Sequence, residues 1–260
     1  MQSNMQGKRI YYSPSSSNEK IIQKLKKITK LKFEPLPSDP IARTERLKTI
    51  KEGIYIWADG RTHHESYFFT YKKVKGKINI DAHSDFDDGF YIDYYNHMRY
   101  TMRDNVEIIT TRYIENTMTK EEKKETLIKT IEEAEQAMKK NRVKEYALTI
   151  DCDAIIGFPV INYWVYDWAL EPIALIEKLK NMRGRVALFD FGGLAPNIKD
   201  FELRGKDLEK VLEKPPAHKE IMMFTGELDY LGKKAIKQSV IDKVGTYATA
   251  VYAALINIFI

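Results

Sequence analysis

The sequence predicts an α/β fold with three layers, α/β/α, and a mainly parallel sheet. Short runs of β-branched and apolar residues alternate along the chain with segments of helical periodicity, an order typical of βαβ units. Several of the short runs are almost continuously apolar, as strands are when helices cover both faces of a sheet. The chain has 260 residues, of which 43% are hydrophobic, so we expect a single domain over residues 1–260.

The expected strands are runs rich in branched and aromatic side chains. They cover residues 8–12, 32–36, 53–58, 77–82, 106–113, 145–152 and 185–191, with a further candidate at 221–225. In an open parallel sheet, ligands bind outside the carboxyl ends of the strands. The residues that follow each strand are therefore the first place to look for a functional site.

The expected helices combine polar start signals with a helical spacing of apolar residues. They cover residues 16–29, 40–51, 64–74, 120–140, 171–182 and 233–258. Ser16 and Glu19 have the spacing of a capping box. Asp39 is the expected N-cap of the second helix, with Pro40 in its first turn. Gly245 predicts an interruption in the last helix.

Charge and cysteine content narrow the class of protein. The lysine runs are interleaved with glutamate or spread along helical faces, and the formal net charge is only +5, which indicates a solvated surface rather than nucleic-acid binding. The single cysteine, Cys152, excludes an internal disulfide and favours a cytoplasmic protein. No signal peptide is expected. The apolar stretch 247–260 is shorter than the roughly 20 residues of a membrane-spanning helix, so we expect a buried terminal helix and no membrane partner.

Two expected strands end in acidic and imidazole side chains. The first ends in Asp81, His83 and Asp85, and the second ends in Asp151 and Asp153. In an extended chain, residues two apart point to the same side and lie roughly 6.5 to 7 Å apart. Either pair alone is common in acidic surface loops. Together, each directly after an apolar strand, they indicate a metal site.

Four carboxylates in one place repel one another unless cations compensate their charge. Two divalent ions about 3.5 to 4 Å apart could share a carboxylate and hold a bridging water. Oxygen-rich ligands with a minority of imidazole favour Mn²⁺, while Zn, Fe or Co stay possible. The sequence therefore predicts a site for two Mn²⁺ ions and a small-molecule substrate.

The two motifs resemble those of the arginase and agmatinase ureohydrolases, within the wider arginase/deacetylase fold. The family's Asp-Ala-His-x-Asp motif is matched at Asp81, Ala82, His83 and Asp85, and its later Asp-x-Asp motif follows in the same order. The likeness covers residues 53–196. It implies that these ligands hold two manganese ions together with one earlier histidine, and it implies a homo-oligomer.

Either His63 or His64 could be that earlier histidine, because the family's Gly-Gly-Asp-His-Ser pattern is matched only loosely here. His97 lies 12 residues beyond Asp85, where the resemblance implies a histidine that passes protons to the leaving amine. The alternative for His97 is an ordinary loop residue with a hydrogen bond. His97 and Asp85 are the two residues expected to be catalytic.

The chain departs from the family pattern at the substrate. The family has a glutamate that binds the guanidinium of the substrate, and Gly193 stands in its place; Ile156 likewise replaces an aspartate of the second motif. We therefore expect a substrate other than arginine or agmatine. Glu227 could compensate for the missing carboxylate, or it could be a turn residue.

The resemblance leaves three functions to weigh. The first is a two-metal hydrolase of a linear, non-peptide C–N bond. The second is a non-catalytic metal-binding protein that keeps the fold. The third is an amidohydrolase like the deacetylase branch, which binds one zinc and carries a catalytic tyrosine after a glycine-rich turn; Leu194 occupies that place here. Retention of both acidic motifs favours the first.

Overall fold

The computed structural model describes most of the chain. The described residues are 9–70, 73–85, 90–94, 96–101, 105–113, 120, 127–128, 130–160, 170–195, 198, 200–205, 207–222 and 236–260.

A parallel sheet forms the middle of the molecule. Its strand order is β2-β1-β3-β8-β7-β4-β5-β6, and within the described residues every pairing between these strands is parallel. The strands are β1 (Ile10–Tyr12), β2 (Phe33–Pro35), β3 (Gly53–Ile56), β4 (Gly76–His83), β5 (Asn105–Tyr113), β6 (Leu127–Ile128), β7 (Tyr146–Asp151) and β8 (Val186–Gly192). The predicted α/β/α fold with its mainly parallel sheet is confirmed.

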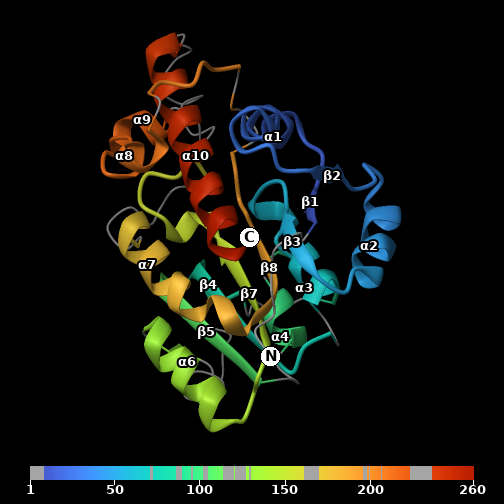
Figure 1. Cartoon of the computed structure of the whole chain (residues 1–260). Coiled ribbons are helices and arrows are strands. Elements are labelled where there is room, and N and C mark those ends of the chain that lie inside the picture. Colours follow the sequence, from blue (N-terminus) through green and yellow to red (C-terminus); the bar gives the residue numbers. More distant parts are fainter. Residues whose placement is uncertain are drawn as a thin grey trace.

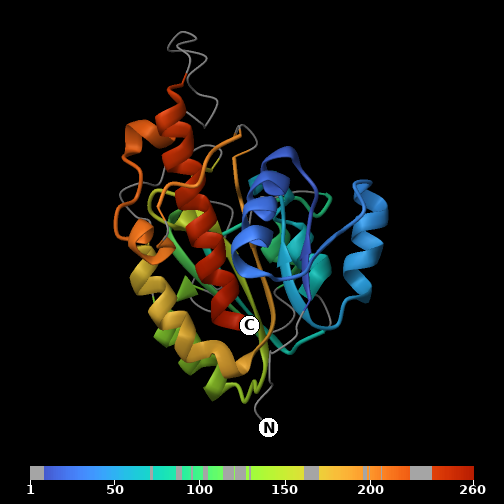
Figure 2. The same ribbon diagram turned by 45° about the horizontal axis from the view of Figure 1, so that its top comes forward.

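Helices cover both faces of this sheet (Figures 1 and 2). The helices used below are α1 (Ser16–Thr29), α2 (Pro40–Thr49), α3 (Glu65–Thr70), α4 (His97–Thr101), α6 (Ile131–Lys140), α7 (Pro172–Met182), α8 (Leu208–Leu212), α9 (His218–Met222) and α10 (Gln238–Phe259). The larger core lies under α1, α6, α7 and α10. The smaller core lies under α2 and α3 on the other face.

Residues of β3 alternate between these two cores. Ile54 and Ile56 pack in the larger core, whereas Tyr55 and the following Trp57 pack in the smaller one. Successive side chains of a strand point to opposite faces, so a strand covered on both sides needs apolar residues at every position. This is the physical reason for the continuous apolar runs in the sequence.

The second helix begins as the sequence predicts. Asp39 caps α2 by accepting the backbone N–H of Ala42 at 2.8 Å, and Pro40 opens the helix. The cap of α1 lies one residue earlier than expected, because the hydroxyl of Ser15 rather than Ser16 accepts the backbone N–H of Asn18. Each serine of the run 15–17 is a possible N-cap, and the helix begins after the first of them.

The helix expected at 120–140 is wrong at residues 127–128, while residues 121–126 and 129 lie outside the described ranges. Residues 127–128 form β6, and α6 begins only at Ile131. Thr130 and Glu133 make a reciprocal capping box there, with each side chain accepting the other's backbone N–H. This cap satisfies amide groups at the start of α6 and so fixes its first turn.

Three further element predictions need correction. Among the described residues, the helix expected at 64–74 is limited to α3, with residues 64 and 73–74 outside it; residues 71–72 lie outside the described ranges. The strand expected at 221–225 is wrong at Ile221, which lies in α9, where Glu220 accepts the N–H of Ala217 at 2.7 Å as a cap; residues 223–225 lie outside the described ranges. The interruption expected at Gly245 is absent, since α10 runs through it.

Gly245 serves packing rather than a helix break. A Cβ atom at this position would lie 2.3 Å from the ring of Phe201. The glycine thus allows the Phe201 ring to lie directly against the backbone of α10. Most residues of α10 are buried, as expected for the terminal apolar stretch. In the described part of the chain, no helix combines the length and apolar character needed to cross a membrane.

Candidate metal centre

The carboxyl ends of β4 and β7 bring the two acidic motifs side by side. These strands are neighbours in the sheet, with Ile80 paired to Ile150 just before each motif begins. The backbone N–H of Ala82 donates to Asp153 Oδ1 at 3.1 Å. His83 Nδ1 lies 2.9 Å from Asp153 Oδ2. The fold therefore places both motifs at the sheet edge where the sequence predicts a ligand site.

A short turn after β3 carries His63 to the same edge. The 3₁₀ turn Gly60–Thr62 follows Asp59, whose carboxylate accepts the backbone N–H of Arg61 at 3.0 Å. His63 comes directly after this turn and is only 1% exposed. Its ring stacks on Trp57, with ring centroids 4.5 Å apart. The turn and the stacking fix the direction of the imidazole.

His63 points its Nδ1 atom into a group of three carboxylates. Nδ1 lies 3.1 Å from Asp85 Oδ2, 3.3 Å from Asp81 Oδ2 and 3.5 Å from Asp151 Oδ2. His64 belongs to no group with metal-ligand spacing among the described residues. The geometry thus separates the two histidines that the sequence left as alternatives.

Three sets of side chains offer ligand atoms that lie within 4.8 Å of one another. The sets are His63, Asp81 and Asp151; Asp81, His83 and Asp153; and His63, Asp85 and His97. Asp81 belongs to the first two sets, with Oδ2 near His63 and Oδ1 3.7 Å from His83 Nδ1. A carboxylate placed in this way can be shared by two cations.

The backbone at Asp85 turns its carboxylate back towards the group. Asp85 has φ 54°, in the left-handed region that non-glycine residues seldom adopt. Its carbonyl oxygen accepts the N–H of Met98 at 3.2 Å, which ties the turn to α4. Such conformations cost on the order of 1–3 kcal/mol and are concentrated at functional sites.

Burial and neighbouring charges shift the pKa values of the side chains in this group in different directions. Burial raises the pKa of Asp85 and Asp151, and neighbouring carboxylates raise it further. Burial would also raise the pKa of Asp81, but hydrogen bonds and charge from His63 and His83 outweigh it and hold that pKa well below its usual value. The acidic neighbours overcome the effect of burial on His83 and raise its pKa to about 12.

Protons on the imidazoles therefore balance part of the buried negative charge. Divalent cations would take over this balance, because carboxylate oxygens and imidazole nitrogens are their usual ligands. The donor atoms, their spacing and the excess of buried carboxylates fit a pair of divalent metal ions.

His97 lies inside the group rather than at its edge. It is fully buried, and its Nδ1 is 3.3 Å from both Asp85 Oδ2 and the carbonyl oxygen of Tyr94. Burial, together with the nearby charges of His63 and Lys77, lowers the pKa of His97 well below its usual value. The structure thus brings His97 close to the other site residues, at a distance at which it could exchange a proton or bind a metal.

Comparison with known proteins shows the fold. No family model and no curated protein sequence matches the chain. Arginase from Bacillus subtilis superposes with a TM-score of 0.59 at 12% identity, over 96% of this chain and 98% of that one. A hypothetical agmatinase from Burkholderia thailandensis gives 0.60 at 12% identity, over 98% and 87%. The chain has the arginase fold. Formimidoylglutamase from Bacillus subtilis has it too, with a TM-score of 0.58 at 13% identity over 96% and 87%.

Gly193 lies at the end of β8 in this arginase fold and contacts the centre directly. It has φ 100°, and a Cβ atom there would lie 2.5 Å from Asp151 Oδ1. With this backbone, the position cannot hold a side chain without displacing Asp151. Glu227, the residue considered as a compensating carboxylate, lies outside the described part of the chain.

No role was predicted for four buried polar residues beneath the centre. They are Ser66, Lys77, Thr149 and Asp190, each at most 2% exposed. Three of them lie within the predicted strands. A polar residue among apolar neighbours is the one sequence signal that could have indicated a role for them. Their contacts with each other and with His63 became apparent only in the folded arrangement.

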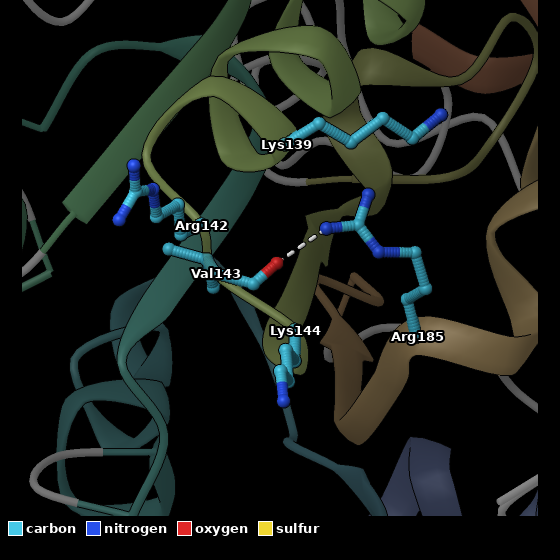
Figure 3. A pocket seen from close by; sticks show the side chains of 5 residues that line it. All are labelled: Lys139, Arg142, Val143, Lys144 and Arg185. Carbon is cyan, nitrogen blue, oxygen red and sulfur yellow. Dashed lines mark hydrogen bonds between the residues drawn. The ribbon is translucent and has the colours of Figure 1, made fainter.

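A hollow elsewhere on the molecule is lined mainly by basic side chains, in contrast to the acidic candidate metal centre. Lys139, Arg142, Val143, Lys144 and Arg185 line it, beside the amino ends of β7 and β8. Figure 3 shows the cationic ends of Lys139, Arg142 and Lys144 pointing away from one another, while Arg185 donates to the carbonyl oxygen of Val143. Because these charges do not converge, the hollow has no arrangement for holding an anion.

Proposed function

We propose that the chain is a metal-dependent hydrolase of a linear, non-peptide C–N bond, with two divalent ions at the centre. One observation carries this proposal. Asp81 is shared by two ligand sets at the carboxyl ends of β4 and β7, the buried set with His63 and Asp151 and the half-buried set with His83 and Asp153, which is the arrangement a metal pair requires. The arginase fold supports it, since the arginase and the formimidoylglutamase that superpose on the chain bear the names of C–N hydrolases.

The residues divide between two cation positions. His63, Asp85 and Asp151 would bind on one side of Asp81, and His83 and Asp153 on the other. Manganese suits this oxygen-rich set. When bound, the ions would supply Lewis acidity and a nucleophile derived from water near neutral pH.

The chain's own residues would then position and move protons. Asp85, held by its turn and by the N–H of Met98, orients His97 through the 3.3 Å contact between their side chains. His97, with its low pKa, is neutral near pH 7 and can accept a proton there. Its burial keeps bulk water from competing for that proton.

The substrate proposed here is not arginine or agmatine. A guanidinium is normally bound by a carboxylate, and Gly193 supplies none where the ureohydrolases have glutamate. The close approach of Gly193 to Asp151 also leaves no room for a side chain. We therefore place the substrate among small linear amides, which are neutral and do not need that carboxylate for binding.

The test combines metal content with a substrate panel. Asp81→Ala is expected to abolish both binding of the metal pair and hydrolysis. Asp242→Asn is the matched control, because Asp242 is equally buried but pairs with Arg204 far from the centre. Unchanged hydrolysis in Asp81→Ala contradicts the proposal.

A non-catalytic metal-binding protein is the second candidate, and the loss of the family's glutamate at Gly193 favours it. Full metal content without hydrolysis of any amide, amidine or guanidine in the panel would support this candidate over the enzyme.

A further inference from the structure

A chain of buried hydrogen bonds runs from His63 into the interior. His63 Nε2, the ring atom facing away from the carboxylates, lies 3.4 Å from Thr149 Oγ1. Thr149 Oγ1 in turn donates to Asp190 Oδ1 at 2.5 Å. Ser66 Oγ donates to Asp190 Oδ2 at 3.0 Å, and Lys77 Nζ donates to Ser66 Oγ at 2.9 Å.

The direction of these bonds determines the tautomer of His63. A threonine hydroxyl has one proton, and here Thr149 gives it to Asp190. The lone pairs of Thr149 therefore face His63, so Nε2 of a neutral His63 must carry the ring proton. In this neutral form the other ring nitrogen, Nδ1, has a lone pair for a cation bound among Asp81, Asp85 and Asp151, in place of the proton that it shares with these carboxylates when no cation is bound.

Asp190 holds the chain in this direction because it is surrounded by donors. Trp57 Nε1 donates to its Oδ1 at 3.2 Å, beside the bond from Thr149. Trp57 also stacks on His63 with an interplanar angle of 15°. The indole of Trp57 therefore contacts both the His63 ring, which it orients by stacking, and Asp190, which accepts the hydrogen bond from Thr149.

Lys77 sets the donor-to-acceptor direction of the hydrogen bonds in this network. An ammonium group only donates, so Ser66 Oγ accepts from Lys77 and turns its own proton towards Asp190 Oδ2, at 3.0 Å, and Thr149 Oγ1, at 3.1 Å. A lysine in the buried strand β4 has no role in packing that an apolar residue would not perform better. The carboxylates of Asp190, Asp85 and Asp81 are near enough to stabilise its cation electrostatically.

We propose that Thr149 is a positioning residue, and that with Asp190, Ser66 and Lys77 it holds His63 as the Nε2–H tautomer that presents Nδ1 to a divalent ion. This inference rests on the proposed function. Partners of this kind behind a metal-bound histidine typically change metal affinity by about 10–100-fold. The structure therefore assigns to Thr149 a contribution to metal affinity although it binds no metal itself.

The experiment measures Mn²⁺ affinity by competition with a chelator dye in four proteins: wild type, Thr149→Val, Thr149→Ser and Thr249→Val. Thr149→Val keeps the shape but removes the hydroxyl, so a loss of about 10-fold or more is expected. Thr149→Ser restores the hydroxyl and is expected to restore the affinity. Thr249 is a matched control, because it is equally buried and its hydroxyl donates to the carbonyl oxygen of Gly245 in α10.

The outcomes separate this inference from the proposed function. If wild type binds no divalent metal, the proposed function fails and this inference fails with it. If wild type binds and Thr149→Val binds equally well, or if Thr149→Ser is as weak as the valine variant, only the positioning role is overturned. Thr149→Ala repeats the test should the valine variant fold poorly.

Discussion

The backbone N–H of Ala82 donates to Asp153 Oδ1 across 3.1 Å, and this bond joins the motif that ends β4 to the motif that ends β7. The two segments are 71 residues apart in sequence. Their meeting follows from neighbouring positions in a parallel sheet, whose strands all end at one edge.

His63 and His64 are adjacent in sequence but have different surroundings, so they form a matched pair of variants. His63→Ala removes a ligand from the buried group and is expected to weaken metal binding by at least about tenfold. His64→Ala is expected to leave metal affinity within about twofold of wild type, because His64 lies outside the ligand sets of the described residues. Isothermal titration with Mn²⁺ measures both, and a larger loss in His64→Ala would refute the assignment.

Gly193→Ala is expected to destabilise the protein and disturb Asp151. The new methyl group would lie 2.5 Å from Asp151 Oδ1 on a backbone with φ 100°. We expect the free energy of unfolding to fall by about 2–4 kcal/mol, from strain and overlap together.

Gly205→Ala provides the control for Gly193→Ala. Gly205 also has positive φ, 91°, but a methyl group there meets its nearest atom, on Val211, only at 3.9 Å. Gly205→Ala therefore has the strain of a positive φ but no overlap. Its free energy of unfolding, measured with urea, should fall by clearly less than that of Gly193→Ala. Equal losses would mean that the contact with Asp151 is unimportant.

Lys77 should make stability depend on pH in a defined direction. Burial lowers the pKa of Lys77 from 10.5 to about 8. Between these values the unfolded chain keeps the proton that the folded chain has lost, so the free energy of unfolding rises with pH. The rise attributable to Lys77 is at most about 3–4 kcal/mol over the whole window.

Lys77→Met isolates that contribution. Urea unfolding of wild type and variant is measured from pH 7.5 to 10. The free energy of unfolding of wild type should rise relative to that of Lys77→Met as pH increases. A difference that stays constant would mean that the folded protein keeps the lysine protonated throughout.

Gly245→Ala tests the continuity of α10. In an exposed helix this change stabilises by about 1 kcal/mol, since alanine is the better helix former. Here the methyl group would lie 2.3 Å from the Phe201 ring, so a net loss of about 1–3 kcal/mol is expected. Gly184→Ala, where no atom lies within 4 Å, should lack this loss. Thermal unfolding distinguishes the two, and a stabilised Gly245→Ala would contradict the packing role.

The sheet and the two acidic motifs could be predicted because their signals are local. An apolar run followed by Asp81 or by Asp151 is visible in a few residues, and parallel strands place such ends together. Helix limits were less predictable, because α6 begins where the Thr130 side chain finds a partner in Glu133. Several serines before α1 are possible N-caps, and the sequence does not indicate which of them caps the helix.

The choice between the two histidines and the network beneath the centre could not be read from the sequence. Only the turn after β3 determines that His63, and not its neighbour, faces the carboxylates. Thr149 and Asp190 are 41 residues apart, and Lys77 reaches them through Ser66. Contacts of this kind depend on strand register, which no local pattern reveals.

Metal content per folded chain is the most direct test of the central claim. The protein is reconstituted with manganese, freed of unbound ions and measured by elemental mass spectrometry. The shared Asp81 predicts about two manganese ions per chain, reduced to less than one in Asp81→Ala. A single tightly held zinc, with no second ion under any loading, would favour the one-metal amidohydrolase. Absence of bound metal in the folded wild type would contradict the account.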